Sequence, residues 1–291
     1  MTARYHSIAN GRGGSERSRW LVGLLLPAAL SLTIAAGRPA TAADADALDQ
    51  IKMRGVLVVG TKADYQPFGF RDSNGAIVGF EPDLARDIAS VLGVRLELVP
   101  VTATNRIVLL ADGKLDLVIA TMNDTPERRK QVDFVQPSYY ASGVNVLAPK
   151  LLQVHVWQQL RGKQTCTIEG AFYVEEIKRR YEPELVTFAN TGDMYDALQR
   201  GRCLAVVYDD TAIIGKLQSP DWRAFEMPLR SILVEPWGMA VRPGEARLEQ
   251  VLSDCVREWH HSGRIVALEE RWNIPKSGFA AEMRQKYAED Q

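Results

Sequence analysis

The chain has 291 residues, of which 46% are hydrophobic and 24% are charged, a balance typical of a globular protein rather than a disordered or fibrous one. It carries 35 Lys and Arg residues against 36 Asp and Glu residues, with no long basic run. Nucleic-acid binding, which requires a basic face, is therefore not expected.

The first 42 residues have the pattern of a secretory signal peptide. Arg17 and Arg19 precede an apolar run over residues 20–36, and small residues at 40–42 form a cleavage-like site. The run is shorter than the ~20 residues that a spanning helix needs, although an uncleaved anchor is the alternative. We therefore predict export to the periplasm with removal of residues 1–42.

From residue 56 onward, strand-like and helix-like segments alternate. The first series contains a hairpin centred on Asn74-Gly75, a strong turn signal. Its strands are predicted at 56–60, 94–101 and 116–120, and its helices at 81–92, 104–113 and 125–130. The second series has predicted strands at 164–168, 184–188 and 203–209, and predicted helices at 171–181, 191–200 and 210–217. Two further helices are predicted at 245–262 and 264–272.

This alternation predicts two α/β lobes with parallel sheets that are covered by helices on both faces. Extended segments at 142–149 and 236–243 are predicted to cross between the lobes. The predicted organisation is a first lobe of residues 48–142 and 239–275, a second lobe of residues 143–238, and a C-terminal tail of residues 276–291. Ligands of such sheets bind beyond the carboxyl ends of the strands.

Three cations at residues 128–130 follow Thr125-Pro126-Glu127, in which Thr125-Pro126 has the pattern of a helix N-cap followed by proline at the first helical position. Helices prefer acids in their first turn, so this arrangement suggests a receptor for an anion. The alternative is a solvated basic turn, partly neutralised by Asp124 and Glu127.

The cysteines are three in number and all lie after the signal segment. Cys166 and Cys203 fall on the first and third predicted strands of the second lobe, which are neighbours in the common doubly wound order. We predict a disulfide between them and a buried thiol at Cys255; three free thiols are the alternative. The histidine and cysteine spacing matches no metal site.

Five segments occur together in one order: GTKADYQPFGF, GFEPDLARDIA, DLVIATMNDTPERRK, VDFVQPSYYASG and YDD. Over residues 48–275 this set resembles the periplasmic solute-binding proteins of amino-acid ABC importers. The resemblance implies a type II periplasmic-binding-protein fold, with two doubly wound sheets joined by two crossover strands. It also implies a monomer without a cofactor, which closes on one amino acid and delivers it to a membrane permease.

The resemblance assigns the two ends of the amino acid to opposite lobes. Arg128 would bind the α-carboxylate, with Thr121 as a second donor, and Asn123 stands where relatives have Ser or Thr. Asp209 would accept the α-ammonium group, although it could instead cap the helix that follows it, a role open equally to Asp210.

The resemblance also suggests how the ligand side chain would be recognised. Lys62 and Arg106 match basic positions of the acidic-amino-acid subgroup, which favours a polar or acidic ligand. Against this, Thr191 replaces that subgroup's histidine, and Asp64 adds negative charge or pairs with Lys62.

Aromatic residues would form the walls of the site. Tyr65 and Phe68 correspond to a lid and a wall, although core packing explains Phe68 nearly as well. Gly170 and Phe172, in the loop after the strand at 164–168, complete the expected binding set. Ala103 stands where many relatives have a second stacking aromatic residue.

Two other functions are compatible with the same fold. Exported cyclohexadienyl dehydratases resemble this family, and Glu169 would be the candidate acid of such an enzyme. A ligand-sensing partner of a membrane receptor is the other alternative. We expect a binding protein and not an enzyme.

Overall fold

A computed structural model describes residues 46–288. The predicted signal peptide, residues 1–42, lies outside this range. Within residues 46–288, no helix combines the length and the apolar character that crossing a membrane requires.

The first sheet has the strand order β5-β1-β6-β14-β7. Its strands are β1 (Val56–Thr61), β5 (Arg95–Pro100), β6 (Leu117–Val118), β7 (Asp133–Phe134) and β14 (Ala240–Val241). β1 pairs in parallel with β5 and β6, whereas β14 is antiparallel to both of its neighbours. The parallel arrangement predicted for the whole sheet is therefore wrong at β14, because this strand returns from the other lobe and enters in the opposite direction.

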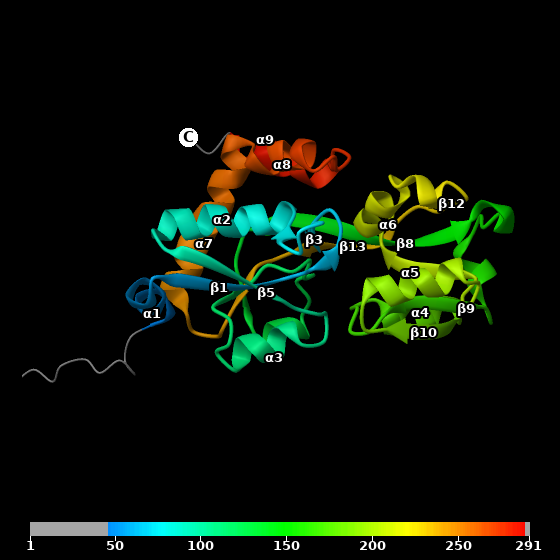
Figure 1. Ribbon diagram of the computed structural model, residues 1–291, viewed down its shortest axis with the longest axis horizontal. Helices are drawn as coiled ribbons and strands as arrows, with labels where there is room; N and C mark the ends of the chain where they lie inside the picture. Colours follow the sequence, from blue (N-terminus) through cyan, green and yellow to red (C-terminus); the bar gives the residue numbers. More distant parts are fainter. Residues whose placement is uncertain (1–45, 289–291) are drawn as a thin grey trace, which may run out of the picture. The chain divides into compact units, whose positions relative to one another are not determined.

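The second sheet has the order β10-β9-β11-β8-β12, with β13 also paired to β8. Its strands are β8 (Tyr140–Pro149), β9 (Gln164–Ile168), β10 (Glu184–Phe188), β11 (Ala205–Asp209), β12 (Phe225–Glu226) and β13 (Ile232–Trp237). β9, β10 and β11 are parallel, while β8 is antiparallel to β11 and β13. β8 contains the first predicted crossover, whereas the second, residues 236–243, begins at the end of β13 and continues into β14. The pairing of residues 140–142 of β8 with residues 235–237 of β13 holds the two connections side by side (Figure 1).

We call the first sheet with its helices the first lobe, and the second sheet with its helices the second lobe. A small three-stranded sheet formed by β2 (Asp64–Tyr65), β3 (Gly69–Arg71) and β4 (Ile77–Val78) belongs to the first lobe. Arg71 pairs with Ile77 around a turn in which Gly75 has a φ of 82°. The predicted hairpin is confirmed, and the positive φ explains the glycine.

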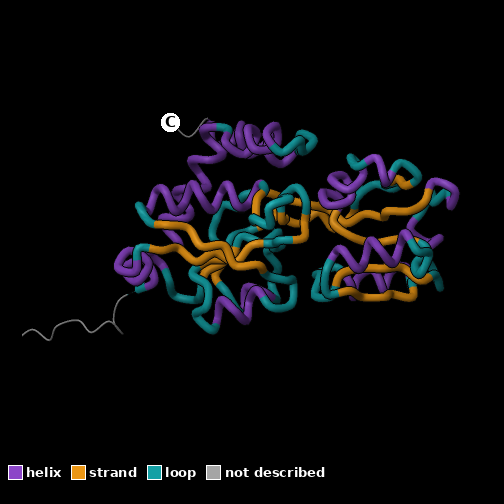
Figure 2. Tube along the Cα trace, viewed as in Figure 1, coloured by secondary structure: helices purple, strands orange, loops and turns teal. Residues whose placement is uncertain are grey.

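Helices lie on both faces of the first sheet, with α2 and α3 on opposite sides (Figures 1 and 2). The helices are α1 (Ala47–Arg54), α2 (Phe80–Leu92), α3 (Arg106–Ala111), α4 (Val174–Tyr181), α5 (Thr191–Gln199), α6 (Asp210–Leu217), α7 (Ala246–Ser262), α8 (Arg264–Arg271) and α9 (Gly278–Ala288). Single 3-10 turns are η1 (Arg128–Lys130), η2 (Lys150–Leu152), η3 (Trp157–Leu160) and η4 (Pro220–Trp222). The sequence analysis did not predict α1, nor α9, which packs on α7 with Tyr287 stacked on His260.

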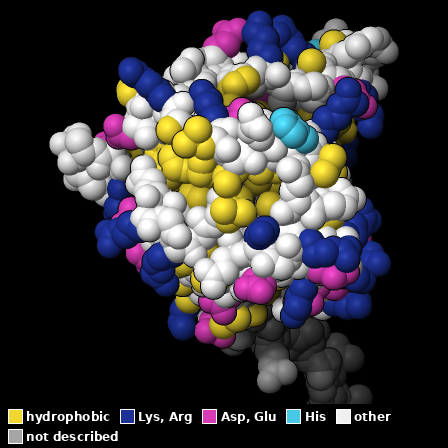
Figure 3. All heavy atoms as spheres, turned by 90° about the vertical axis from the view of Figure 1, so that its right-hand side faces the viewer, with side chains coloured by type: hydrophobic (Ala, Val, Ile, Leu, Met, Phe, Trp, Pro, Cys, Tyr) yellow, Lys and Arg dark blue, Asp and Glu magenta, His cyan; other side chains and the backbone are white. Residues whose placement is uncertain are grey.

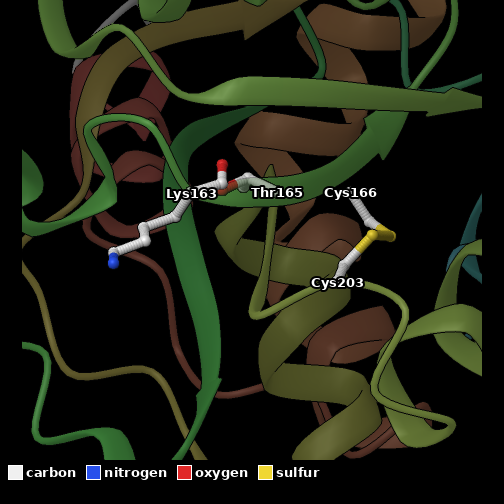
Figure 4. Close-up of a disulfide and its surroundings, with 4 residues drawn as sticks. All are labelled: Lys163, Thr165, Cys166 and Cys203. Carbon is white, nitrogen blue, oxygen red and sulfur yellow. A yellow bond between two sulfur atoms is a disulfide. The ribbon is translucent and has the colours of Figure 1, made fainter.

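The predicted disulfide is present between Cys166 and Cys203, with a Cα–Cα distance of 5.7 Å (Figure 4). β9 and β11 are neighbours as predicted, and Cys166 pairs with Val206. Cys203 lies two residues before β11, so the bridge holds the turn that enters this strand. Cys255 is a buried free thiol on α7, also as predicted.

The end of the second lobe seen in Figure 3 carries a hydrophobic patch surrounded by charged side chains of both signs. Leu151, in η2 at the end of β8, is 96% exposed, whereas most large apolar side chains are buried.

Candidate functional site

A small cavity lies where the strands of the two lobes end, as expected for open α/β sheets. Its volume is about 20 Å³, so an amino acid can enter only when the walls separate. The lining residues come from both lobes: Lys62, Ala103, Arg106, Thr121, Asn123, Arg128, Ile168, Ala171, Phe172, Tyr173, Tyr208 and Asp209. Seven of these belong to the binding set predicted from the sequence.

Arg128 is only 9% exposed and connects the two lobes. Its Nη1 donates to the Asn123 carbonyl at 2.9 Å, and its Nη2 donates to the Gly170 carbonyl at 3.2 Å across the cleft. Burial lowers the pKa of Arg128, although the charge of Asp209 opposes this change. Gly170 has a φ of 75°, which suits glycine and allows its carbonyl to face the arginine.

The helix predicted at residues 125–130 is wrong, because only the three-residue turn η1 forms. The Thr125 hydroxyl accepts a weak hydrogen bond from the Arg128 N–H at 3.4 Å, and the chain then turns into β7. A helix dipole therefore does not explain an anion site here. The other cations differ from Arg128, since Arg129 is 55% exposed and forms an ion pair with Asp124.

Asp209 is 6% exposed at the end of β11. Its Oδ2 accepts a hydrogen bond from the Tyr65 hydroxyl of the first lobe at 3.0 Å. Among the contacts of the described residues, its side chain makes no capping bond to α6, whereas Asp210 accepts from the N–H groups of Gly143 and Thr211. The carboxylate of Asp209 therefore faces the cavity and not the helix.

Burial, and to a smaller extent the charge of Asp210, raises the pKa of Asp209 from 3.8 to about 7. The Tyr65 hydrogen bond and the charges of Arg106 and Arg128 act in the opposite direction. A cation placed beside this carboxylate would favour its ionised form.

Lys62 is 3% exposed, and its Nζ lies 2.8 Å from Asp64 Oδ1. The pairing that the sequence left open is therefore present. Asp64 Oδ2 also accepts the Thr191 N–H at 3.0 Å, and the Thr191 hydroxyl donates to the Asp64 carbonyl at 2.5 Å. Asp64 and Thr191 thus join the two lobes beside the cavity and do not line it.

Of the three aromatic residues expected at the site, Tyr65 and Phe68 do not line the cavity. Phe68 is fully buried, with its ring centroid 5.0 Å from that of Trp237, so it packs in the core. Tyr65 is 2% exposed, and its hydroxyl donates a hydrogen bond to Asp209, which lines the cavity. Phe172 lines the cavity as expected. The sequence analysis missed Tyr208, whose position directly before the predicted Asp209 was the available signal.

Arg106 is 3% exposed, and its Nη1 donates to the Ala120 carbonyl. Burial lowers the pKa of Arg106 to about 9, and the neighbouring charge of Arg128 acts in the same direction. The Nε atom is buried without a hydrogen-bond partner among residues 46–288. This guanidinium group therefore retains donor capacity beside the cavity.

Glu81 was missed as a functional residue, because it entered the sequence analysis only as the first residue of the helix predicted at 81–92. It is fully buried in the first turn of α2, on the same face as Leu84 and Ile88. Its Oε1 accepts the Thr121 N–H and the Tyr139 hydroxyl, each at 2.5 Å. Burial raises the pKa of Glu81 to about 7. The available signal was an acidic residue at a helix position whose spacing from Leu84 and Ile88 places it on the apolar face.

Glu169, the candidate catalytic acid, is exposed and does not line the cavity. Among the described residues, no group of His, Cys, Asp and Glu side chains is arranged to hold a metal ion.

Comparison of the sequence with known proteins identifies the family that it matches. Residues 57–275 match the model of the bacterial extracellular solute-binding proteins, family 3. The ABC transporter glutamine-binding protein GlnH of Bacillus subtilis is 28% identical over 233 residues, which cover 78% of this chain and 84% of that protein. The matched residues 57–275 contain the whole lining of the cavity.

Two solved structures are also similar. A mutant of ArgBP from T. maritima has a TM-score of 0.73 and 33% identity, covering 78% of this chain and 99% of that one. An ancestral amino-acid-binding protein, described as a precursor of cyclohexadienyl dehydratase, has a TM-score of 0.72 and 32% identity, with coverage of 78% and 99%.

Proposed function

This chain belongs to the bacterial extracellular solute-binding proteins, family 3, and on that basis we propose that it captures an amino acid between its two lobes. It has the two-lobed α/β fold of the type II periplasmic binding proteins. The observation that carries the proposal is that Arg128 and Asp209, from opposite lobes, line one cavity.

The two charges suit the two ends of a zwitterion. The planar guanidinium of Arg128 can bind an α-carboxylate through two hydrogen bonds, and the Thr121 hydroxyl provides a second donor. The Asp209 carboxylate accepts the α-ammonium group and is held toward the cavity by Tyr65. Ligand binding then favours the closed arrangement, because one molecule contacts both lobes.

A polar or acidic side chain is the preferred ligand chemistry. Lys62 is already paired with Asp64, so its charge is largely neutralised. Arg106 is not paired in this way: it donates to a carbonyl and keeps a buried Nε without a partner among the described residues. A carboxylate or amide at the end of the ligand side chain would satisfy this donor.

The biological role that follows is delivery of the amino acid to the permease of an ABC importer. In this proposal the predicted signal peptide directs export to the periplasm, where the protein acts as a monomer without a cofactor. Family membership and the relationship to GlnH support this role.

A thermal-shift screen of the twenty amino acids, followed by titration calorimetry, tests the proposal. We expect at least one polar or acidic amino acid to bind, and its analogues lacking the α-amino or the α-carboxyl group to bind at least a hundredfold more weakly. Absence of binding by all twenty amino acids would refute amino-acid capture.

No observation on the site favours a dehydratase, because Glu169 is exposed and outside the cavity lining. Incubation of the purified protein with prephenate and with arogenate checks this directly, and we expect no turnover of either compound.

A further inference from the structure

Thr121 has a backbone conformation that its residue type rarely adopts. Its φ is 46°, in the left-handed region, where a β-branched side chain is strongly disfavoured. The residue is also 5% exposed and lines the cavity. Strain of this kind persists only where surrounding contacts hold it, and it often occurs at functional sites.

The contact that holds Thr121 comes from α2. Glu81 Oε1 accepts the Thr121 N–H at 2.5 Å, and the same oxygen accepts the Tyr139 hydroxyl. Glu81 is fully buried, and its Oε2 has no hydrogen-bond partner within residues 46–288. A buried carboxylate is costly, so its direct bond to the strained residue calls for a functional explanation.

The residues on both sides of Thr121 hold the arginines of the cavity. The Ala120 carbonyl accepts a hydrogen bond from Arg106, and the Asn123 carbonyl accepts one from Arg128. The turn at Thr121 sets the directions of these two carbonyl groups relative to each other. It therefore also sets the relative directions of the two guanidinium groups.

We propose that Glu81 is a positioning residue for ligand binding: it holds the turn at residues 120–123 and thereby aims Arg106 and Arg128 at the carboxylate or amide groups of the ligand. The proposal rests on the proposed function, because it assigns a ligand to the two arginines. Glu81 itself does not contact the ligand, since it is absent from the cavity lining.

Two substitutions of Glu81 distinguish the effect of its hydrogen bonds from the effects of its charge and of its volume. Glu81→Met keeps the approximate volume but cannot accept a hydrogen bond, and we expect the Kd of the best amino acid to rise at least twentyfold. Glu81→Gln keeps an acceptor oxygen, and we expect a rise of less than fivefold. Equal losses in both variants would overturn the proposal, because Glu81 would then act through its charge.

The matched control is Asp116, another buried carboxylate of the first lobe. It is 6% exposed and accepts the Val58 N–H at 2.8 Å, without belonging to the cavity lining. We expect Asp116→Asn to lower the melting temperature while the Kd stays within twofold. A comparable loss of affinity in Asp116→Asn would overturn the proposal, because damage to the first lobe in general would then explain the effect.

A second protein that carries Thr121→Gly provides the decisive test, because glycine adopts a positive φ without a hydrogen bond to hold it there. In that background we expect Glu81→Met to change the Kd less than threefold. An undiminished effect of Glu81→Met in this background would overturn the positioning role.

Glu81→Met and Thr121→Gly also test the positioning role if no amino acid binds. In that case the proposed function is wrong, but the role of Glu81 in holding the turn can still be measured through stability. Urea unfolding of the four proteins should show that Glu81→Met raises the unfolding equilibrium constant less in the Thr121→Gly background than in the wild type, the increase in the wild type being at least fivefold larger. Equal increases in the two backgrounds would show that Glu81 does not hold the strained turn.

Discussion

Replacing Arg128 by alanine should remove most of the amino-acid affinity. The side chain is 9% exposed and already donates to two carbonyl groups, so it is fixed before a ligand binds. Without it, the α-carboxylate would be buried with no cationic partner, which costs about 2–5 kcal/mol. This corresponds to a roughly thirtyfold to several thousandfold increase in Kd.

The loss of the bond from Arg128 to the Gly170 carbonyl acts in the same direction, because this bond connects the two lobes. A hydrogen bond from a charged donor contributes about 1.5–3 kcal/mol, but it overlaps with the carboxylate effect and is not added to it. Arg128→Lys should be intermediate, since lysine keeps the charge and loses the planar two-point contact.

Titration calorimetry with the best ligand measures these effects. Arg129→Ala is the matched control, because Arg129 is adjacent in sequence, 55% exposed and paired with Asp124. We expect its Kd to stay within about twofold of the wild type, as for a surface ion pair. A change of less than fivefold in a folded Arg128→Ala protein would refute the assignment of the carboxylate.

Three further predictions concern pH, closure and the disulfide. Because Asp209 must be ionised to bind an ammonium group and burial raises its pKa from 3.8 to about 7, affinity should fall as the pH falls through 7, and Asp209→Asn should abolish this dependence. In the ligand-free protein, the raised pKa of Asp209 has the opposite effect, because the folded state binds the proton more tightly than the unfolded state. The stability that Asp209 contributes is fully present below about pH 4 and is lost as the pH rises through about 7. The free energy of unfolding then falls by at most ~1.4 kcal/mol per pH unit. Small-angle scattering should give a smaller radius of gyration with saturating ligand, because closure brings the lobes together. Replacing both Cys166 and Cys203 by alanine should lower the free energy of unfolding by up to ~4 kcal/mol, given their separation of 37 residues.

Each of these predictions has a result that contradicts it. Affinity that is constant between about pH 5 and pH 8 would exclude Asp209 as the titrating partner of the ligand. An unchanged radius of gyration at saturation would argue against closure. Cys255→Ala is the control for the disulfide, and a loss of stability there as large as in the double variant would assign the effect to core packing.

The local pattern of the sequence was sufficient for most elements of the fold. Apolar spacing predicted the helix at 81–92 that forms as α2, and Asn74-Gly75 predicted the hairpin, because these signals act within one or two turns of chain. The neighbouring positions of β9 and β11 followed from the alternation of strands and helices, and with them the disulfide. Seven of the lining residues were named only through the family resemblance, whose motifs lie near the strand ends.

Tertiary contacts alone decided the rest. The helix expected after Pro126 shortened to η1 because the chain turns at once into β7. Phe68 entered the core, and Asp64 bonded to Thr191, 127 positions away in the sequence. Glu81 accepts a hydrogen bond from Thr121, which lies 40 positions away in the sequence. The burial of Glu81 and the strained backbone of Thr121 therefore have no signature in the local sequence. Burial and hydrogen-bond partners depend on which segments meet in space, and one-dimensional patterns do not contain that information.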